Sequence, residues 1–178
     1  AMSSTNLSSF IWSVADLLRG NYKQSDYGKV ILPFSVLRRL DCVLEPTKQA
    51  VLNELAVRTK AGLNPSPFLL KKSGQLFFNT SPLDLKKLMG DQSNIAENLR
   101  SYVQAFSPDV REIFEHFEFA VQIDRLAKAD LLYLVTEKFA NIDLHPDAVS
   151  NAEMGQVFEE LIRRFAELSN ETAGEHFT

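Results

Sequence analysis

The sequence is poor in the residues that most often build catalytic and metal sites. It holds one cysteine, Cys42, so no disulfide framework is possible and a reducing, intracellular setting is expected. The three histidines, His116, His145 and His176, lie far apart and lack partners at zinc-ligand spacing. The seven glycines are scattered singly, without the G-x-G pattern of a phosphate-binding loop. Neither a metal site nor a nucleotide loop is predicted.

Long apolar runs and an excess of positive charge are also missing. No apolar stretch approaches the ~18 residues of a membrane span, and the N-terminus lacks a charged-then-apolar signal pattern. We therefore expect a cytoplasmic protein without membrane contact. The formal net charge of −4 argues against a general polyanion binder, so any nucleic-acid contact must come from a local basic patch.

What the sequence does have is apolar residues at helical spacing. They predict helices over 7–18, 27–45, 47–57, 82–89, 95–106 and 108–117, with shorter pieces near 123–126 and 131–139. Pro33 predicts a kink or a helix restart within the second of these. The last predicted helix runs from Ser150 to about Leu168, begins with a capping box of Ser150 and Glu153, and is expected to pack centrally.

The stretch "FLLKKSGQLFFN" (68–79) departs from this helical pattern. Two short apolar segments flank Ser73-Gly74, which is typical of a tight turn between two strands. The length of 178 residues fits one domain. The expected fold is therefore mainly α, a compact multi-helix domain of six to eight helices with one small β-hairpin near residues 68–78.

Candidates for chemistry are few. The "EHFE" run, Glu115 to Glu118, places its carboxylates on the solvent side of a helix whose phenylalanines point inward. Cys42 has no histidine partner in the pattern and is better explained as a small core residue. No catalytic residue is predicted within this chain.

Basic residues gather in the first half of the chain, and they have two explanations. They could be ordinary solvated charges, or they could neutralise nucleic-acid phosphates. Arg38 and Arg39 interrupt an apolar helix, so a pairing with Asp41 or with a carboxylate of a partner is a structural alternative for them. The phosphate candidates are Lys23, Lys29, Arg38, Arg39, Lys71, Lys72, Lys86 and Lys87.

Five stretches, in this order, carry a resemblance to a known family. They are "GNYKQSDYGKVILPFSVLRRLDCVLEPTK" (20–48), "LFFNTS" (76–81), "YVQAFSPDVREIFEHFEF" (102–119), "IDLHPDAVSNAEMGQVFEELIRRFAE" (142–167) and "AGEHFT" (173–178). Together they resemble the N-terminal helical domain of the modification subunit, a DNA methyltransferase, of type I restriction–modification systems. The resemblance extends from about Leu7 onward.

The resemblance implies a division of the chain. Residues 7–169 would form the helical domain, and residues 170–178 would be a linker into an absent methyltransferase domain. Residues 1–6 would be a flexible N-terminus, in which Ala1 before Met2 is typical of a residue left by cloning. In the family the absent domain methylates the N6 amino group of adenine in DNA and uses S-adenosylmethionine. By resemblance, four residues belong to its cofactor site: Glu175, His176, Phe177 and Thr178.

The same resemblance implies the partners. They are double-stranded DNA, a specificity subunit that determines the recognised sequence, a second modification subunit and the restriction subunit. This domain would serve subunit assembly and clamp DNA through its phosphates, and the chain alone is expected neither to methylate nor to bind the cofactor well. The acidic net charge leaves a second hypothesis, a purely protein-binding helical adaptor without DNA contact.

Overall fold

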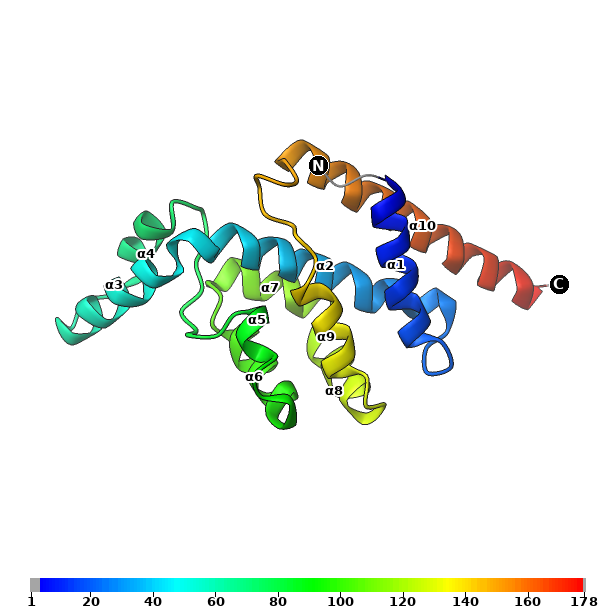
Figure 1. Cartoon of the computed structure of the whole chain (residues 1–178), viewed down its shortest axis with the longest axis horizontal. Coiled ribbons are helices and arrows are strands. Elements are labelled where there is room, and N and C mark those ends of the chain that lie inside the picture. The colour runs from blue at the N-terminus through cyan, green and yellow to red at the C-terminus, as the bar shows by residue number, and fades with distance from the viewer. Residues whose placement is uncertain (1–3, 178) are drawn as a thin grey trace.

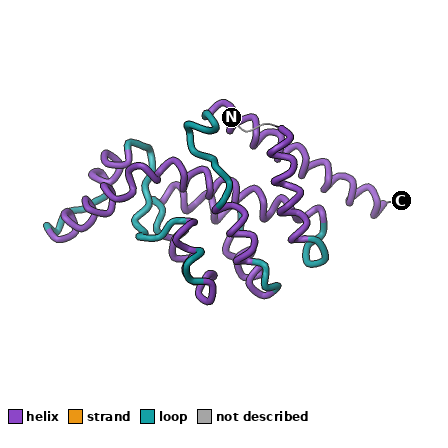
Figure 2. The backbone as a smooth tube through the Cα atoms, viewed as in Figure 1, coloured by secondary structure: helices purple, strands orange, loops and turns teal. Residues whose placement is uncertain are grey.

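The computed structural model describes residues 4–177, and these are mainly helical, as expected (Figure 2). The ten α-helices in this range exceed the expected six to eight, because a helix replaces the expected hairpin and the pieces after residue 118 are full helices. Their bounds are α1 Ser4–Leu18, α2 Tyr27–Leu44, α3 Lys48–Lys60, α4 Ser66–Ser73, α5 Leu85–Leu88, α6 Ile95–Gln104, α7 Pro108–His116, α8 Phe119–Lys128, α9 Leu132–Ala140 and α10 Asn151–Phe177. Three 3-10 turns accompany them, η1 Gln24–Asp26, η2 Glu45–Thr47 and η3 Gln92–Asn94.

The expected β-hairpin near residues 68–78 is wrong. Residues 66–73 form helix α4, and Gly74 ends it in a left-handed conformation (φ 66°), with its N–H donating to the carbonyl of Leu70 at 3.1 Å. Gly74 is thus a helix C-cap and not the turn between two strands. Within residues 4–177 there is no β-strand, only two isolated bridges.

Helix α2 is the centre of the domain, a place that the sequence had suggested for the last helix. It packs against α1, α8, α9 and α10 and runs through the middle of the molecule (Figure 1). Most of its residues are buried, as expected for a helix that is apolar almost all round. It continues through Pro33, so the alternative of a restart there is wrong. Its packing holds the helix together despite the one missing backbone donor.

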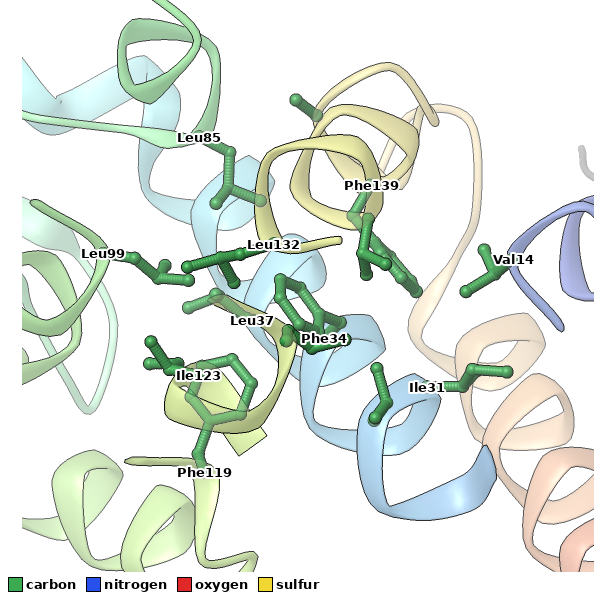
Figure 3. Packing of buried hydrophobic residues seen from close by; sticks show 14 of the residues in the cluster. Val14, Ile31, Phe34, Leu37, Leu85, Leu99, Phe119, Ile123, Leu132 and Phe139 are labelled. Atoms are coloured by element: carbon green, nitrogen blue, oxygen red, sulfur yellow. The ribbon is translucent and has the colours of Figure 1, made fainter. Parts of the chain in front are cut away.

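The main core lies where α2 meets the helices around it (Figure 3). The ring of Phe34 from α2 stacks on Phe139 from α9, with 5.2 Å between centroids, and meets Phe119 from α8 edge-on at 5.0 Å. Leu99 from α6 and Leu132 from α9 are fully buried beside them. These contacts fix the body of the domain, from which the other elements project.

Helix α10 confirms its predicted start. Ser150 and Glu153 form the capping box. The backbone N–H of Ser150 donates to the Glu153 carboxylate at 3.2 Å, and the backbone N–H of Glu153 donates to the Ser150 hydroxyl at 3.1 Å. The helix extends to Phe177, well past the expected end near Leu168. Its apolar residues form one stripe against η1 and α2, so it lies on the surface of the domain.

None of the helices in residues 4–177 is long and apolar enough to cross a membrane.

Candidate nucleic-acid interface

Helices α3 and α4 form a basic arm at one end of the molecule (left in Figure 1). We call residues 48–73 the basic arm. They contain five basic residues and one acidic residue, in a chain whose net charge is −4. The two helices pack mainly on each other. The arm therefore concentrates positive charge on a projecting element.

The arm folds around a small apolar cluster of its own. Val51 from α3 and Leu69 from α4 are buried there together with Phe78. The guanidinium of Arg58 lies 3.8 Å from the ring centre of Phe68, and its Nε donates to Glu54 at 2.6 Å. These contacts join α3 to α4. They also pair the guanidinium of Arg58 with partners inside the arm.

Two connections hold the arm to the body. The backbone N–H of Phe78, just after the arm, donates to the hydroxyl of Ser107 at 3.1 Å, and the carbonyl of Phe78 accepts from the backbone N–H of Ser107 at 3.0 Å. At the start of α3, the Lys48 ammonium lies 5.5 Å from the ring centre of Tyr102. Burial lowers the pKa of Lys48, and the nearby Lys87 lowers it further, whereas Asp41 and Asp84 oppose both effects. Helix α5, which carries Lys87, is therefore close to the base of the arm.

Four of the predicted phosphate contacts lie on the arm itself or on α5, near the base of the arm. Lys71 and Lys72 lie in the last turn of α4, and Lys86 and Lys87 lie on α5. All four side chains are exposed. Within residues 6–170, the ammonium groups of Lys71, Lys72 and Lys86 have no hydrogen-bond or ion-pair partner, and that of Lys87 reaches only the carbonyl of Pro82 at 3.4 Å. Free ammonium groups of this kind are available to phosphates.

The other two predicted lysines lie elsewhere. Lys23 precedes η1 and Lys29 is in the first turn of α2, whereas the arm follows the far end of α2. An 18-residue helix separates the two groups, a length of about 27 Å. Lys29 also pairs with Asp26 at 3.2 Å. The structure therefore does not bring these lysines together with those of the arm.

Arg38 and Arg39 are internal residues, and their exposed fractions are 2% and 6%. Arg38 donates to Asp41 at 2.7 Å, the structural alternative considered from the sequence, and to the carbonyl of Ile142 at 2.9 Å. Arg39 binds the carbonyls of Leu144 and Val149 in the connection between α9 and α10, and the side chain of Asn151 at the start of α10. Their donors are occupied within the fold, so we leave both out of the phosphate surface.

Asp41 is the centre of a buried polar network. Its carboxylate accepts from Arg38, from the hydroxyl of Tyr102 at 2.6 Å and from the backbone of Leu85 at 3.4 Å. Burial raises the pKa of Asp41, and the bonds from Tyr102 and Arg38 counteract that rise. The network joins α2 to α5 and α6, and it has no open side for a substrate.

His145 fastens the connection between α9 and α10 to the end of α2. Its ring nitrogens lie 2.7 Å from Asp143 and 2.7 Å from Glu45. Burial lowers the pKa of His145, but the bonds to these carboxylates outweigh it, so the pKa is raised above its ordinary value. The sequence pattern had given this histidine no role, because Glu45 is 100 positions away. Within the described residues no group of three or more His, Cys, Asp or Glu side chains could hold a metal ion.

The predicted cofactor residues lie at the end of α10. The backbone of Glu175, His176 and Phe177 is helical, and Thr178 lies outside the described residues. The structure describes no side-chain geometry there. Their role therefore stays a prediction from the resemblance.

Sequence reasoning missed three basic residues of the arm, Lys48, Arg58 and Lys60. Lys60 is exposed in the last turn of α3. A count of charges along the chain would have found them, because Glu54 is the only acidic residue between 48 and 73. The missing information was that α3 and α4 fold onto each other, which gathers these charges on one element.

Comparison with known proteins gives one match. Residues 7–139 match the HsdM N-terminal domain family. No curated protein and no solved structure matches the chain. The matched range covers most of the chain and includes helices α2 to α8 and the whole basic arm. The chain thus belongs to the HsdM N-terminal domain family, the N-terminal domain of the modification subunit of type I restriction–modification systems.

Proposed function

We propose that this domain holds double-stranded DNA through its phosphates, with the basic arm and α5 as the contact surface. The observation that carries the proposal is the set of free, exposed ammonium groups of Lys71 and Lys72 on the projecting arm and of Lys86 on α5, in a chain whose net charge is −4. Lysines on a docking face neutralise phosphates without recognising bases. The family supports a DNA partner, since its members belong to a methyltransferase subunit.

In this proposal the domain does no chemistry of its own. The parent subunit transfers a methyl group from S-adenosylmethionine to the N6 atom of adenine, and Glu175, His176, Phe177 and Thr178 contribute to the cofactor site only together with the catalytic domain. A specificity subunit selects the sequence, and a second modification subunit and the restriction subunit complete the complex. Labelled S-adenosylmethionine incubated with this chain and an adenine-containing duplex should yield no methylated DNA.

The test of DNA holding is the salt dependence of binding. We expect Lys71→Ala with Lys72→Ala to reduce the slope of log affinity against log salt by about two units in the assembled modification complex, because each lost phosphate contact accounts for about 0.9. At about 0.15 M salt the same loss corresponds to roughly 30-fold weaker binding. The effect should be equal on cognate and non-cognate duplexes, since phosphates carry no sequence information.

The matched control removes the same charge elsewhere. Lys128→Ala with Lys138→Ala changes two exposed lysines on α8 and α9 and should leave the slope unchanged. An equal effect of both double variants would mean that net charge alone is being measured, and it would contradict the proposal. Weakening confined to the cognate sequence with an unchanged slope would also contradict it.

A purely protein-binding adaptor remains the competing function. The apolar side chains of Val57, Leu63 and Leu70 are exposed on the same arm and favour a protein surface. Under that function, the loss of Lys71 and Lys72 would impair subunit assembly in the absence of DNA. Sedimentation of the complex without DNA separates the two functions.

A further inference from the structure

The turn after α4 exposes an apolar side chain. Leu76 is 95% exposed, the largest value among the large apolar residues whose side chains the structure describes. Its neighbours Gln75 and Phe77 line a groove between α2 and α10, and Leu76 does not. Single exposed leucines are common on protein surfaces, so exposure alone would carry nothing. The geometry of the turn and its surroundings adds two further observations.

The turn that carries Leu76 is fixed on both sides by one side chain. The Ser73 hydroxyl accepts from the backbone N–H of Gln75 at 3.2 Å and donates to the carbonyl of Phe77 at 2.9 Å. Gly74 takes the left-handed conformation that the turn needs. Phe78, which directly follows the turn, is buried in the apolar cluster of the arm. Leu76 is therefore held outward by an ordered turn.

The charge around this turn indicates what covers the leucine. Lys71 and Lys72 immediately precede it, in the last turn of α4, and both ammonium groups are free within residues 6–170. No acidic residue occurs between Glu54 and Asp84. A covering partner must therefore be compatible with a cluster of unpaired positive charge, which favours a polyanion over an ordinary protein surface.

We infer that Leu76 inserts into the minor groove of the bound duplex, where it acts as an apolar wedge between neighbouring base pairs, while Lys71 and Lys72 hold the flanking phosphates. This inference rests on the proposed DNA contact of the basic arm. Architectural DNA-binding proteins use Leu, Phe, Ile, Met or Pro in this way, and the inserted side chain partly unstacks one base step and bends the DNA. An ordered turn beside exposed basic residues suits such a wedge, and the turn at Leu76 has both features.

The test compares Leu76→Ser with Leu76→Met in the assembled modification complex. Loss of a buried leucine contact should weaken DNA binding about tenfold for Leu76→Ser, and the salt slope should stay unchanged because no charge is removed. Leu76→Met keeps an apolar side chain and should bind as the unaltered complex does. Val121→Ser, at an exposed apolar residue of α8, is the matched control and should have no effect, since Val121 lies outside the basic arm and the turn that follows it.

A second measurement locates the wedge. Duplexes with 2-aminopurine at successive positions should show increased fluorescence at one base step, because the probe brightens when it is unstacked. The increase should be absent with Leu76→Ser and present with Leu76→Met. Equal affinity and equal fluorescence for the serine and methionine variants would overturn the inference. Weaker subunit assembly without DNA for Leu76→Ser would also overturn it, because Leu76 would then contact protein.

The wedge and the phosphate contact can fail separately. If Lys71→Ala with Lys72→Ala reduces the salt slope but Leu76→Ser has no effect, the arm holds DNA and the wedge is wrong. If the lysine variant leaves the slope unchanged, the proposed DNA contact of the arm is itself wrong, and the wedge fails with it.

Discussion

Asp41→Asn should be among the most damaging conservative changes in this domain. The substitution keeps the volume of the side chain and removes its charge. Arg38, which is 2% exposed and donates to Asp41 at 2.7 Å, then stays buried without its carboxylate and keeps only the carbonyl of Ile142. Asparagine can still accept from Tyr102 through its amide oxygen. The charge of Arg38 is therefore the main loss.

The expected magnitude follows from the burial of the pair. Removing one partner of a buried ion pair lowers the free energy of unfolding by about 3–5 kcal/mol. Tyr102→Phe removes the 2.6 Å hydrogen bond from the tyrosine hydroxyl to the same carboxylate and should lower the free energy of unfolding by about 1.5–3 kcal/mol. Glu54→Gln, in the partly exposed pair with Arg58, should change it by no more than about 1 kcal/mol. The order of the three variants is the prediction.

Urea unfolding followed by circular dichroism measures these differences. A loss of 3–5 kcal/mol moves the midpoint by at least about 1 M urea when the slope is 1–3 kcal/mol/M. Arg38→Met combined with Asp41→Asn should recover part of the loss, because the unpaired buried charge is then absent. If Asp41→Asn and Glu54→Gln have the same small effect, the reasoning about the buried network is refuted.

Two further predictions concern the attachment of α10. The pKa of His145 is raised in the folded state, so its contribution to stability is complete below about pH 6.5 and is lost as the pH rises through the folded pKa. His145→Asn should abolish this part of the pH dependence of urea unfolding above about pH 6.5. An identical pH dependence in the two proteins would contradict this. Gly28→Ala should lower the free energy of unfolding by about 1–3 kcal/mol, because its new Cβ would lie 2.9 Å from Cβ of Phe165. Gly155→Ala, with no atom within 4 Å of the new Cβ, should instead raise it by up to about 1 kcal/mol in the same unfolding assay, and equal losses for both alanines would exclude the clash at Phe165.

Helical periodicity was enough to predict most of the fold, and its failures have local causes. The capping box of Ser150 and Glu153 was readable because both partners are three residues apart. The false hairpin arose because Gly74 suits a tight turn and a helix C-cap equally well. What distinguishes them is the bond from the N–H of Gly74 to the carbonyl of Leu70, which closes a helical turn, and the packing of α4 on α3, and the sequence displays neither.

The candidate site was less accessible to sequence reasoning. Adjacent arginines in a helix looked like a basic pair, but the acceptors of Arg39 lie more than 100 residues away along the chain. Only the fold shows that these donors are occupied. Conversely, Lys60 and Lys71 are eleven residues apart and belong to one arm because α3 and α4 pack together. Long-range packing, which a single sequence does not encode visibly, decided both cases.

Proximity cleavage shows whether the basic arm lies against DNA, the contact on which the proposed function depends. Lys72→Cys, carrying an iron chelate that generates hydroxyl radicals, would be assembled into the modification complex on end-labelled duplex. Cys42, the only cysteine in the chain, is buried and burial raises its pKa to about 11, so within this chain the label goes to the new position. If the arm lies against DNA, the chelate at position 72 should cleave the strand at one position, and a chelate at Lys128→Cys on α8 should cleave none. Absence of cleavage from position 72, or equal cleavage from both positions, would contradict it.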